Sequence, residues 1–201
     1  MKRISLSFLL LFFLISTTFE KSANAYSTDP EKFISEIIDE AKVILSSSSS
    51  QEIKANKLSE IALKTVDIKG LAYYTLGKKR KEISSSELNK YEQLFEKYFL
   101  KSFTARLTDY SDPKISVLSS ETVSEKYTIV KTMLLKTDKK PEVKIDWRVY
   151  TKDPSKPLIR DLIVEGLSLA RTQKEEFSSI LSANNGDINI LFEALEKFVT
   201  Q

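Results

Sequence analysis

The spacing of apolar residues changes from a helical to a strand period after residue 112 and back near residue 169, and this limits the fold more than any other feature. Apolar side chains recur every three or four positions over 33–45 and 88–107, and alternate with polar ones over 143–149. Separate runs of helices and strands are typical of an α+β fold. We therefore expect a twisted antiparallel sheet of about four to five strands with helices packed on it. Such a sheet, curled around its helices, forms a cone with one apolar mouth.

Local signals predict where several of these elements begin and end. Asp29 before Pro30 has the order of a helix N-cap and first helical residue. Ser84 and Glu87 have the spacing of a capping box, and Gly77 can end a helix in the left-handed conformation. Turns are expected at 138–141 and 153–157, and a last helix is expected after Asp187.

The first 25 residues have the order of a cleaved secretory signal peptide. Lys2 and Arg3 form a positive start, 8–15 is an unbroken apolar run, and 23–25 reads Ala-Asn-Ala, which fits an A-x-A cleavage site. The apolar run is shorter than the roughly 20 residues that a membrane span needs. We expect cleavage after Ala25, which leaves 26–201 as a single exported domain in the periplasm.

Composition excludes several classes of function. The chain of 201 residues has no cysteine and no histidine, so it lacks a thiol nucleophile, thiolate metal ligands and the usual general base at neutral pH. Its formal charge is +3, of which the predicted signal peptide carries +2, so the mature chain is nearly neutral. The aromatic residues lie on apolar stripes rather than among basic residues, which argues against nucleic-acid binding. We therefore expect that the protein is not an enzyme.

Two charged groups remain open to more than one interpretation. Asp146, Asp161 and Glu165 are close to aromatic residues in the sequence and could form a carboxylate site. We favour structural roles, with Asp146 on the outer face of its strand and the other two capping the junction of strand and helix. The basic run 78–81 is either a solvated cluster at a helix C-terminus or a surface for anionic headgroups or an acidic partner.

The segment 146–181 resembles the C-terminal signature of the MlaC / toluene-tolerance family. That signature has a D-[YF]-x-[LVW] strand, a turn, and a second strand that ends in D-[VML]-I-x-E-G-[VIL]-S. The corresponding residues here are 146–149, which read DWRV, and 161–168, which read DLIVEGLS. The E-G-[VIL]-S block carries most of the resemblance, and weaker matches extend over nearly all of the predicted mature chain.

The resemblance implies a periplasmic phospholipid-binding carrier with an NTF2-like cone and an apolar cavity between sheet and helices. Its relatives shuttle lipid between an outer-membrane lipoprotein complex and an inner-membrane ABC transporter that includes an MCE-domain protein. It implies no cofactor, with a bound phospholipid as cargo, and no catalytic residue.

We expect the acyl chains to lie against the aromatic residues of the helix over 88–107 and the apolar residues of the sheet. Leu76 and Leu167 are expected to close the mouth, the latter by its place in the E-G-[VIL]-S block. The full expected lining is Leu76, Phe95, Phe99, Phe103, Ile129, Met133, Ile145, Trp147, Val149 and Leu167.

Two alternatives to a lipid carrier stay open on the sequence. The first is an NTF2-like enzyme that acts on a small apolar substrate through a carboxylate and a tyrosine, which requires Asp161, Glu165 or a neighbour inside the cone with a raised pKa. The second is a non-lipid scaffold whose cone is filled by its own side chains.

Overall fold

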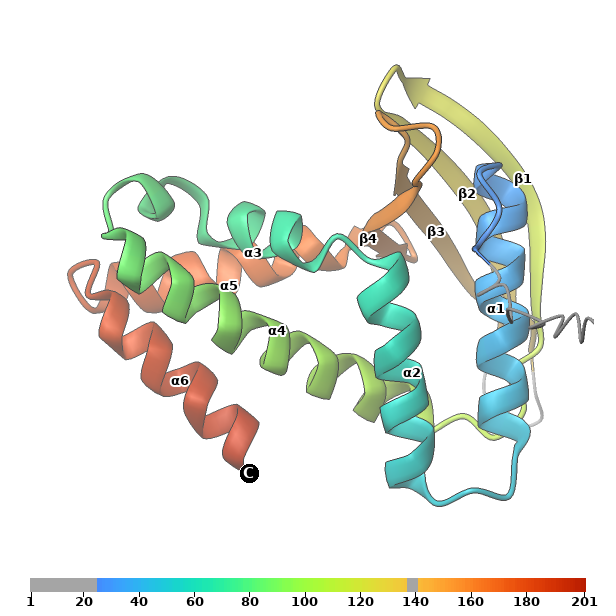
Figure 1. Ribbon diagram of the computed structural model, residues 1–201, viewed down its shortest axis with the longest axis horizontal. Helices are drawn as coiled ribbons and strands as arrows, with labels where there is room; N and C mark the ends of the chain where they lie inside the picture. Colours follow the sequence, from blue (N-terminus) through green and yellow to red (C-terminus); the bar gives the residue numbers. More distant parts are fainter. Residues whose placement is uncertain (1–24, 137–140) are drawn as a thin grey trace, which may run out of the picture.

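The computed structural model describes residues 25–136 and 141–201, and within them the sheet lies towards one side of the molecule and most of the helices towards the other (Figure 1). The predicted signal peptide up to residue 24, and most of the turn predicted at 138–141, lie outside the described residues. The elements before the sheet are α1 (Pro30–Ser46), α2 (Gln51–Thr65), α3 (Ile68–Leu76), a 3₁₀ turn η1 (Gly77–Lys81) and α4 (Ser85–Thr108). The strands are β1 (Ile115–Ser124), β2 (Tyr127–Leu134), β3 (Val143–Tyr150), β4 (Leu158–Val164) and β5 (Leu167–Ser168), followed by α5 (Leu169–Ala183) and α6 (Ile188–Thr200).

The N-terminal helix caps form as the sequence predicts. The Asp29 carboxylate accepts a hydrogen bond from Lys32 N at 2.9 Å and so caps α1. At the start of α4, Ser84 and Glu87 form both hydrogen bonds of the capping box. Gly77 ends α3 as expected, but its φ of +61° and ψ of −129° lie in another region that favours glycine and not in the predicted left-handed helical one. The N-cap side chains therefore set where α1 and α4 begin.

The strands form one open sheet in chain order, β1-β2-β3-β4-β5, and every neighbouring pair is antiparallel. This confirms the expected α+β fold and strand number. β1 is an edge strand with register shifts between Val117 and Ser119 and between Thr122 and Ser124. At the opposite edge, Val66 forms a parallel bridge with Ile159 of β4, which joins the chain between α2 and α3 to the sheet.

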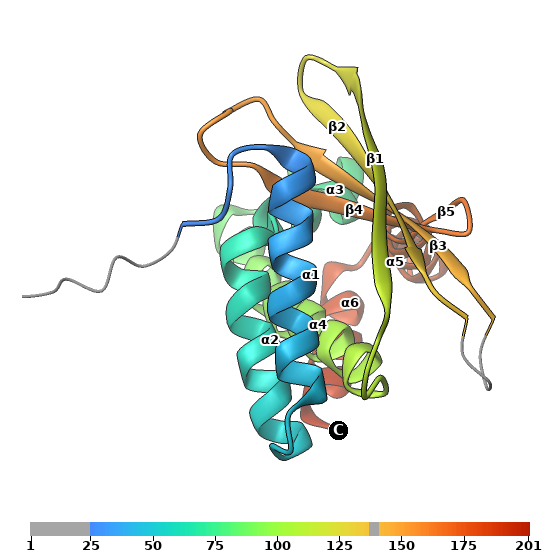
Figure 2. The same ribbon diagram turned by 90° about the vertical axis from the view of Figure 1, so that its right-hand side faces the viewer.

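The two faces of the sheet differ in burial. We call the face that carries Val130, Val149 and Ile159 the inner face, because these residues pack in one core with α1 and α2. Figure 2 shows these two helices side by side next to the sheet. The opposite, outer face carries ion pairs, among them Lys131 with Glu121 at 2.9 Å. In β2 the alternation is complete, since every second residue from Thr128 to Leu134 is buried.

The buried hydrophobic residues that the structure describes form two clusters rather than one. The first joins α1 and α2 to the inner face of the sheet, and the second joins α3, α4, α5 and α6. Val66 packs against both clusters. α4 also spans both, because Tyr91 and Phe95 belong to the second cluster whereas Leu107 packs against the first. No helix of the described residues is long and apolar enough to cross a membrane.

Candidate functional site

α4 carries a row of three phenylalanine rings that runs from one hydrophobic cluster towards the other. Phe95, Phe99 and Phe103 are four residues apart and therefore lie along one side of the helix. The ring centroids of Phe95 and Phe99 are 6.4 Å apart, and those of Phe99 and Phe103 are 5.7 Å apart with an interplanar angle of 9°. Phe95 is buried in the second cluster, whereas Phe103 is half-buried outside both. We call this set the aromatic row.

The inner face of the sheet ends in an apolar patch that the helices cover only partly. In the register of β3 and β4, Trp147 lies opposite Leu162 and Ile145 lies opposite Val164, so these four side chains share the inner face. All four are half-buried. Farther along the same face Val149 is fully buried. We call Ile145, Trp147, Leu162 and Val164 the inner-face patch.

Leu167 extends the inner-face patch to the edge of the sheet. It lies opposite Val164, across a two-residue turn made by Glu165 and Gly166. Both turn residues have positive φ, +49° and +81°, as a tight I′ hairpin turn requires. The turn explains why Glu and Gly precede the apolar residue of the E-G-[VIL]-S block, because it places Leu167 on the inner face next to Val164. Leu167 is 59% exposed, so it lies at the rim of the patch.

The polar group of the single tryptophan is satisfied within the sheet. The indole Nε1 of Trp147 donates a hydrogen bond to Thr132 Oγ1 at 3.0 Å, and that hydroxyl donates to Ile145 O at 2.9 Å. A satisfied indole N–H leaves the rest of the ring free to act as apolar surface. The inner-face patch can therefore contact hydrocarbon without an unpaired donor at Trp147.

The structure separates the residues expected from the sequence into four groups. Leu76 and Phe95 are buried in the second cluster and Val149 in the first, while Phe99, Phe103, Ile145 and Trp147 are half-buried. Leu167 lies at the rim. Ile129 and Met133 lie on the outer face, because β2 buries Thr128, Val130, Thr132 and Leu134 instead. The structure thus does not bring Ile129 and Met133 together with the inner-face residues.

Leu162 and Val164 of the inner-face patch were not singled out from the sequence. A register shift between Arg148 and Val149 against β4 leaves Arg160 as an extra residue, and simple alternation along β4 fails there. The signal that identifies Val164 is the two-residue turn that follows it, because such a turn pairs the residues on either side.

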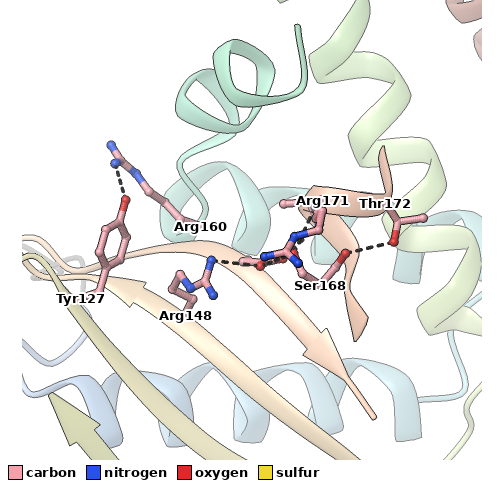
Figure 3. Close-up of polar contacts among 8 residues, drawn as sticks. Tyr127, Arg148, Arg160, Ser168, Arg171 and Thr172 are labelled. Atoms are coloured by element: carbon pink, nitrogen blue, oxygen red, sulfur yellow. Dashed lines mark hydrogen bonds and ion pairs between the residues drawn. The ribbon is translucent and has the colours of Figure 1, made fainter. Parts of the chain in front are cut away.

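Asp161 has a structural role at the junction of β4 and α5. Its carboxylate accepts hydrogen bonds from Ser168 Oγ at 2.6 Å and Ala170 N at 3.0 Å, and lies 3.4 Å from Arg148 Nη1. Ser168 in turn accepts a bond from Arg171 N at 3.1 Å and so caps α5 (Figure 3). These contacts explain why the Asp and Ser of the signature stand seven residues apart.

The other two candidate carboxylates, Asp146 and Glu165, both contact Lys144. Asp146 is on the outer face, with Oδ2 3.5 Å from Lys144 Nζ, and the exposed Glu165 accepts a bond from Lys144 N. Burial raises the pKa of the Tyr91 phenol, which keeps it neutral in the second cluster. Among the described residues no three acidic side chains are placed to hold a metal ion. The aromatic row and the inner-face patch therefore provide apolar contact surface.

Comparisons with known proteins agree with this arrangement. A family model described as MlaC protein matches residues 34–197. No curated protein matches the sequence significantly. Among solved structures, a phospholipid-binding protein from Ralstonia solanacearum, determined in complex with a phospholipid, has a TM-score of 0.71 to this chain. The likeness covers 89% of this chain and 98% of the other at 15% identity, and it shows a shared fold.

Proposed function

The chain belongs to the MlaC family, and on this basis we propose that it binds a phospholipid as cargo and carries it between membranes. The family and the fold shared with a phospholipid-binding protein point to a binding or transport protein rather than an enzyme. The observation that carries the proposal is a pair of half-buried apolar surfaces, Phe99 and Phe103 of the aromatic row and the inner-face patch. In our proposal they lie against the acyl chains, with Leu167 at the mouth.

Half-buried phenylalanine and tryptophan side chains are suited to this role. Each leaves apolar area in contact with water in the empty protein, and removal of that area from water by an acyl chain stabilises the complex by about 25 cal/mol per Å². Phe99 and Phe103 on α4 and Trp147 on β3 offer flat rings without unsatisfied polar atoms, which accept chains of different length and saturation. In this proposal Leu76 and Val149 support the surfaces from behind.

Carriage of lipid by a soluble protein solves a large energetic problem. Two acyl chains contain on the order of 30 methylene groups, so their transfer through open water costs roughly 24 kcal/mol at about 0.8 kcal/mol each. An apolar site on the protein replaces water with a medium similar to the bilayer interior. Exchange between membrane and protein is then nearly balanced, and direction comes from partners.

The proposal also covers the cellular location of the protein and its partners. We propose that it works in the periplasm, between an outer-membrane lipoprotein complex and an inner-membrane ABC transporter with an MCE-domain protein. Membership of the family supports this assignment. The positively charged start and apolar run before residue 25 support export.

The test is native mass spectrometry of the protein purified from a periplasm without detergent. We expect a mass excess equal to one phospholipid, with the lipid identified after extraction. Protein stripped of lipid should regain the excess after incubation with liposomes and re-isolation. A bare mass before and after liposome treatment would contradict the proposal and favour a scaffold that binds no lipid.

A further inference from the structure

A basic surface lies at the end of the molecule away from β1, where α3, η1 and α5 meet (Figure 1). Two adjoining hollows open there, one of about 570 Å³ and one of about 250 Å³, and both are lined by Tyr74 and Lys174. The cations that line them are Lys78, Arg80, Lys81, Arg171 and Lys174, which we call the basic face. Segments about 90 residues apart in the sequence therefore build one positively charged surface.

The charge of the basic face is not neutralised by the protein itself. None of its five cations forms an ion pair with a carboxylate of the described residues. Arg80 donates instead to the backbone oxygen of Tyr73 at 3.4 Å. Glu175 is the single acidic residue among those that line the two hollows. By contrast, the neighbouring Lys79 pairs with Glu82 at 3.3 Å. Five unpaired cations around one acid attract anions from solution.

The rest of the lining suits the interface of a bilayer. Tyr74 is 42% exposed, and Lys174 Nζ lies 5.0 Å from the centre of its ring. Amphipathic rings of this kind are enriched at the level of lipid headgroups. Ser178, Ser179 and Ser182 add hydroxyl groups to the wall of the larger hollow. Cations and hydroxyls together are the groups that hydrogen-bond phosphate oxygens.

We propose that the basic face docks the protein on the surface of an anionic bilayer, with lipid phosphates in the two hollows. An acidic protein surface would satisfy the charges but not the exposed tyrosine and the serine wall, so the lining favours lipid. This docking goes beyond the carriage of cargo, because it concerns contact with a membrane rather than the bound molecule. The cations of the basic face lie on η1 and α5, and the face shares no residue with the inner-face patch on β3 and β4.

The test is flotation of the whole mature protein with vesicles of phosphatidylcholine alone, or with phosphatidylglycerol added at about one part in three. We expect binding to the anionic vesicles, little binding to the neutral ones, and loss of binding as salt is raised. Each cation removed should weaken binding by about fivefold, so Lys78→Gln with Lys81→Gln and Lys174→Gln should weaken it roughly a hundredfold. Circular dichroism checks that the triple variant is folded.

The matched control removes three exposed lysines outside the basic face. Lys32→Gln lies in α1, and Lys126→Gln and Lys152→Gln lie in the turns between strands. It makes the same change in net charge, so it should retain most of the binding if the basic face is responsible. Equal loss in the two triple variants, or a wild-type protein that ignores anionic vesicles, overturns the docking proposal. The latter result would leave an acidic protein as the partner of this surface.

Measurement of cargo separates this proposal from the proposed function. The triple variant of the basic face should copurify with as much lipid as the wild type. If it floats poorly and still carries lipid, docking is supported independently of cargo binding. If it loses its cargo as well, the basic face belongs to the cargo site and the separate docking role is wrong. If the wild type carries no lipid but floats, the cargo proposal fails alone.

Discussion

The guanidinium of Arg160 lies 2.5 Å from the carboxylate of Asp67, measured from Nη2 to Oδ2, and this ion pair joins β4 to the start of α3. Arg160 Nε also donates to the same oxygen at 2.6 Å, and the guanidinium carbon lies 3.5 Å from the centre of the Tyr150 ring. A further bond of 3.1 Å reaches Tyr127 Oη (Figure 3). Val66, the residue before Asp67, packs against both hydrophobic clusters, so the ion pair holds the chain at the point where the two clusters meet.

Asp67→Asn should lower the free energy of unfolding by about 1–3 kcal/mol, because it removes a charge-assisted bond to a half-buried arginine. Asparagine can still cap α3, so the change reports the ion pair. Urea unfolding measures it. The control is Glu196→Gln, which breaks the exposed pair with Lys90 at 3.0 Å and should cost less than about 0.5 kcal/mol. Equal losses in the two variants would contradict the structural role of the Asp67 pair.

Gly70→Ala should destabilise the protein although alanine is the better helix former. A Cβ at Gly70 would lie 2.3 Å from Asp67 Oδ2, so the capping carboxylate has to move away from both Gly70 N and Arg160. We expect a loss of about 1–2 kcal/mol in thermal or urea unfolding. In an Asp67→Ala background the same change should instead stabilise by up to about 1 kcal/mol. A loss of equal size in both backgrounds would show that another clash is responsible.

The capping box of α4 should make stability depend on pH in acid. Ser84 donates to Glu87 Oε2 from its hydroxyl and its N–H, each at 2.7 Å, and these bonds hold the pKa of Glu87 below its usual range. The stabilisation is therefore complete above the ordinary glutamate pKa of about 4.3 and is lost as the pH falls through the lower pKa of the folded state.

Glu87→Gln should remove this part of the acid dependence. Urea unfolding at about pH 5 and about pH 3 should show a smaller loss of stability for the variant than for the wild type. Glu60→Gln, which changes a carboxylate without a hydrogen-bond partner among the described residues, should follow the wild type. If Glu87→Gln loses as much stability between these two pH values as the wild type does, the pKa of Glu87 is the same in the folded and unfolded chain.

Leu167→Glu should reduce lipid loading while it spares the fold. Leu167 is 59% exposed, so the folded protein tolerates a carboxylate there, but the charge would stand at the rim where acyl chains pass. Native mass spectrometry should show a fall in the loaded fraction of roughly tenfold. Leu118→Glu is the matched control, since Leu118 is 57% exposed on the distant edge strand β1. If Leu167→Glu retains full loading, the mouth lies elsewhere.

The single tryptophan reports directly on the cargo site. If acyl chains lie against the inner-face patch, phospholipid with brominated chains should quench the fluorescence of Trp147, since bromine acts only at close range. Lipid-free protein should show emission at longer wavelength, because the half-buried ring is partly hydrated. Protein loaded with the unbrominated lipid is the control. Full fluorescence from protein that carries the brominated lipid by mass would exclude contact with Trp147.

The N-terminal helix caps and the change from helical to strand spacing of apolar residues were predictable, because both depend on residues close together in the sequence. Asp29, Ser84 and Glu87 act on backbone groups three residues away, and each does so in the structure as the sequence predicts. The second half of β1 was not predicted. Its residues 119–122 read Ser-Ser-Glu-Thr, which has no apolar alternation, and pairing with β2 alone makes them a strand.

The candidate site was only partly predictable, because the face of a strand depends on its register. β2 has apolar residues at both odd and even positions. Ile129 and Met133 lie on one face, and Val130 and Leu134 lie on the other. Alternation alone therefore could not select the buried face. The aromatic row was predictable as a stripe on α4, since a four-residue spacing fixes a side of a helix whatever lies opposite.

The order of the strands in the sheet, which equals their order in the chain, bears on how the protein folds. Each strand can pair with the one just made, through connections short enough to close quickly and with little loss of chain entropy. The second cluster closes over a much longer separation, because it joins α3 and α4 to α5 and α6 across the whole run of strands. The sheet can thus serve as the nucleus, and the closing of the helical cluster is the long-range step.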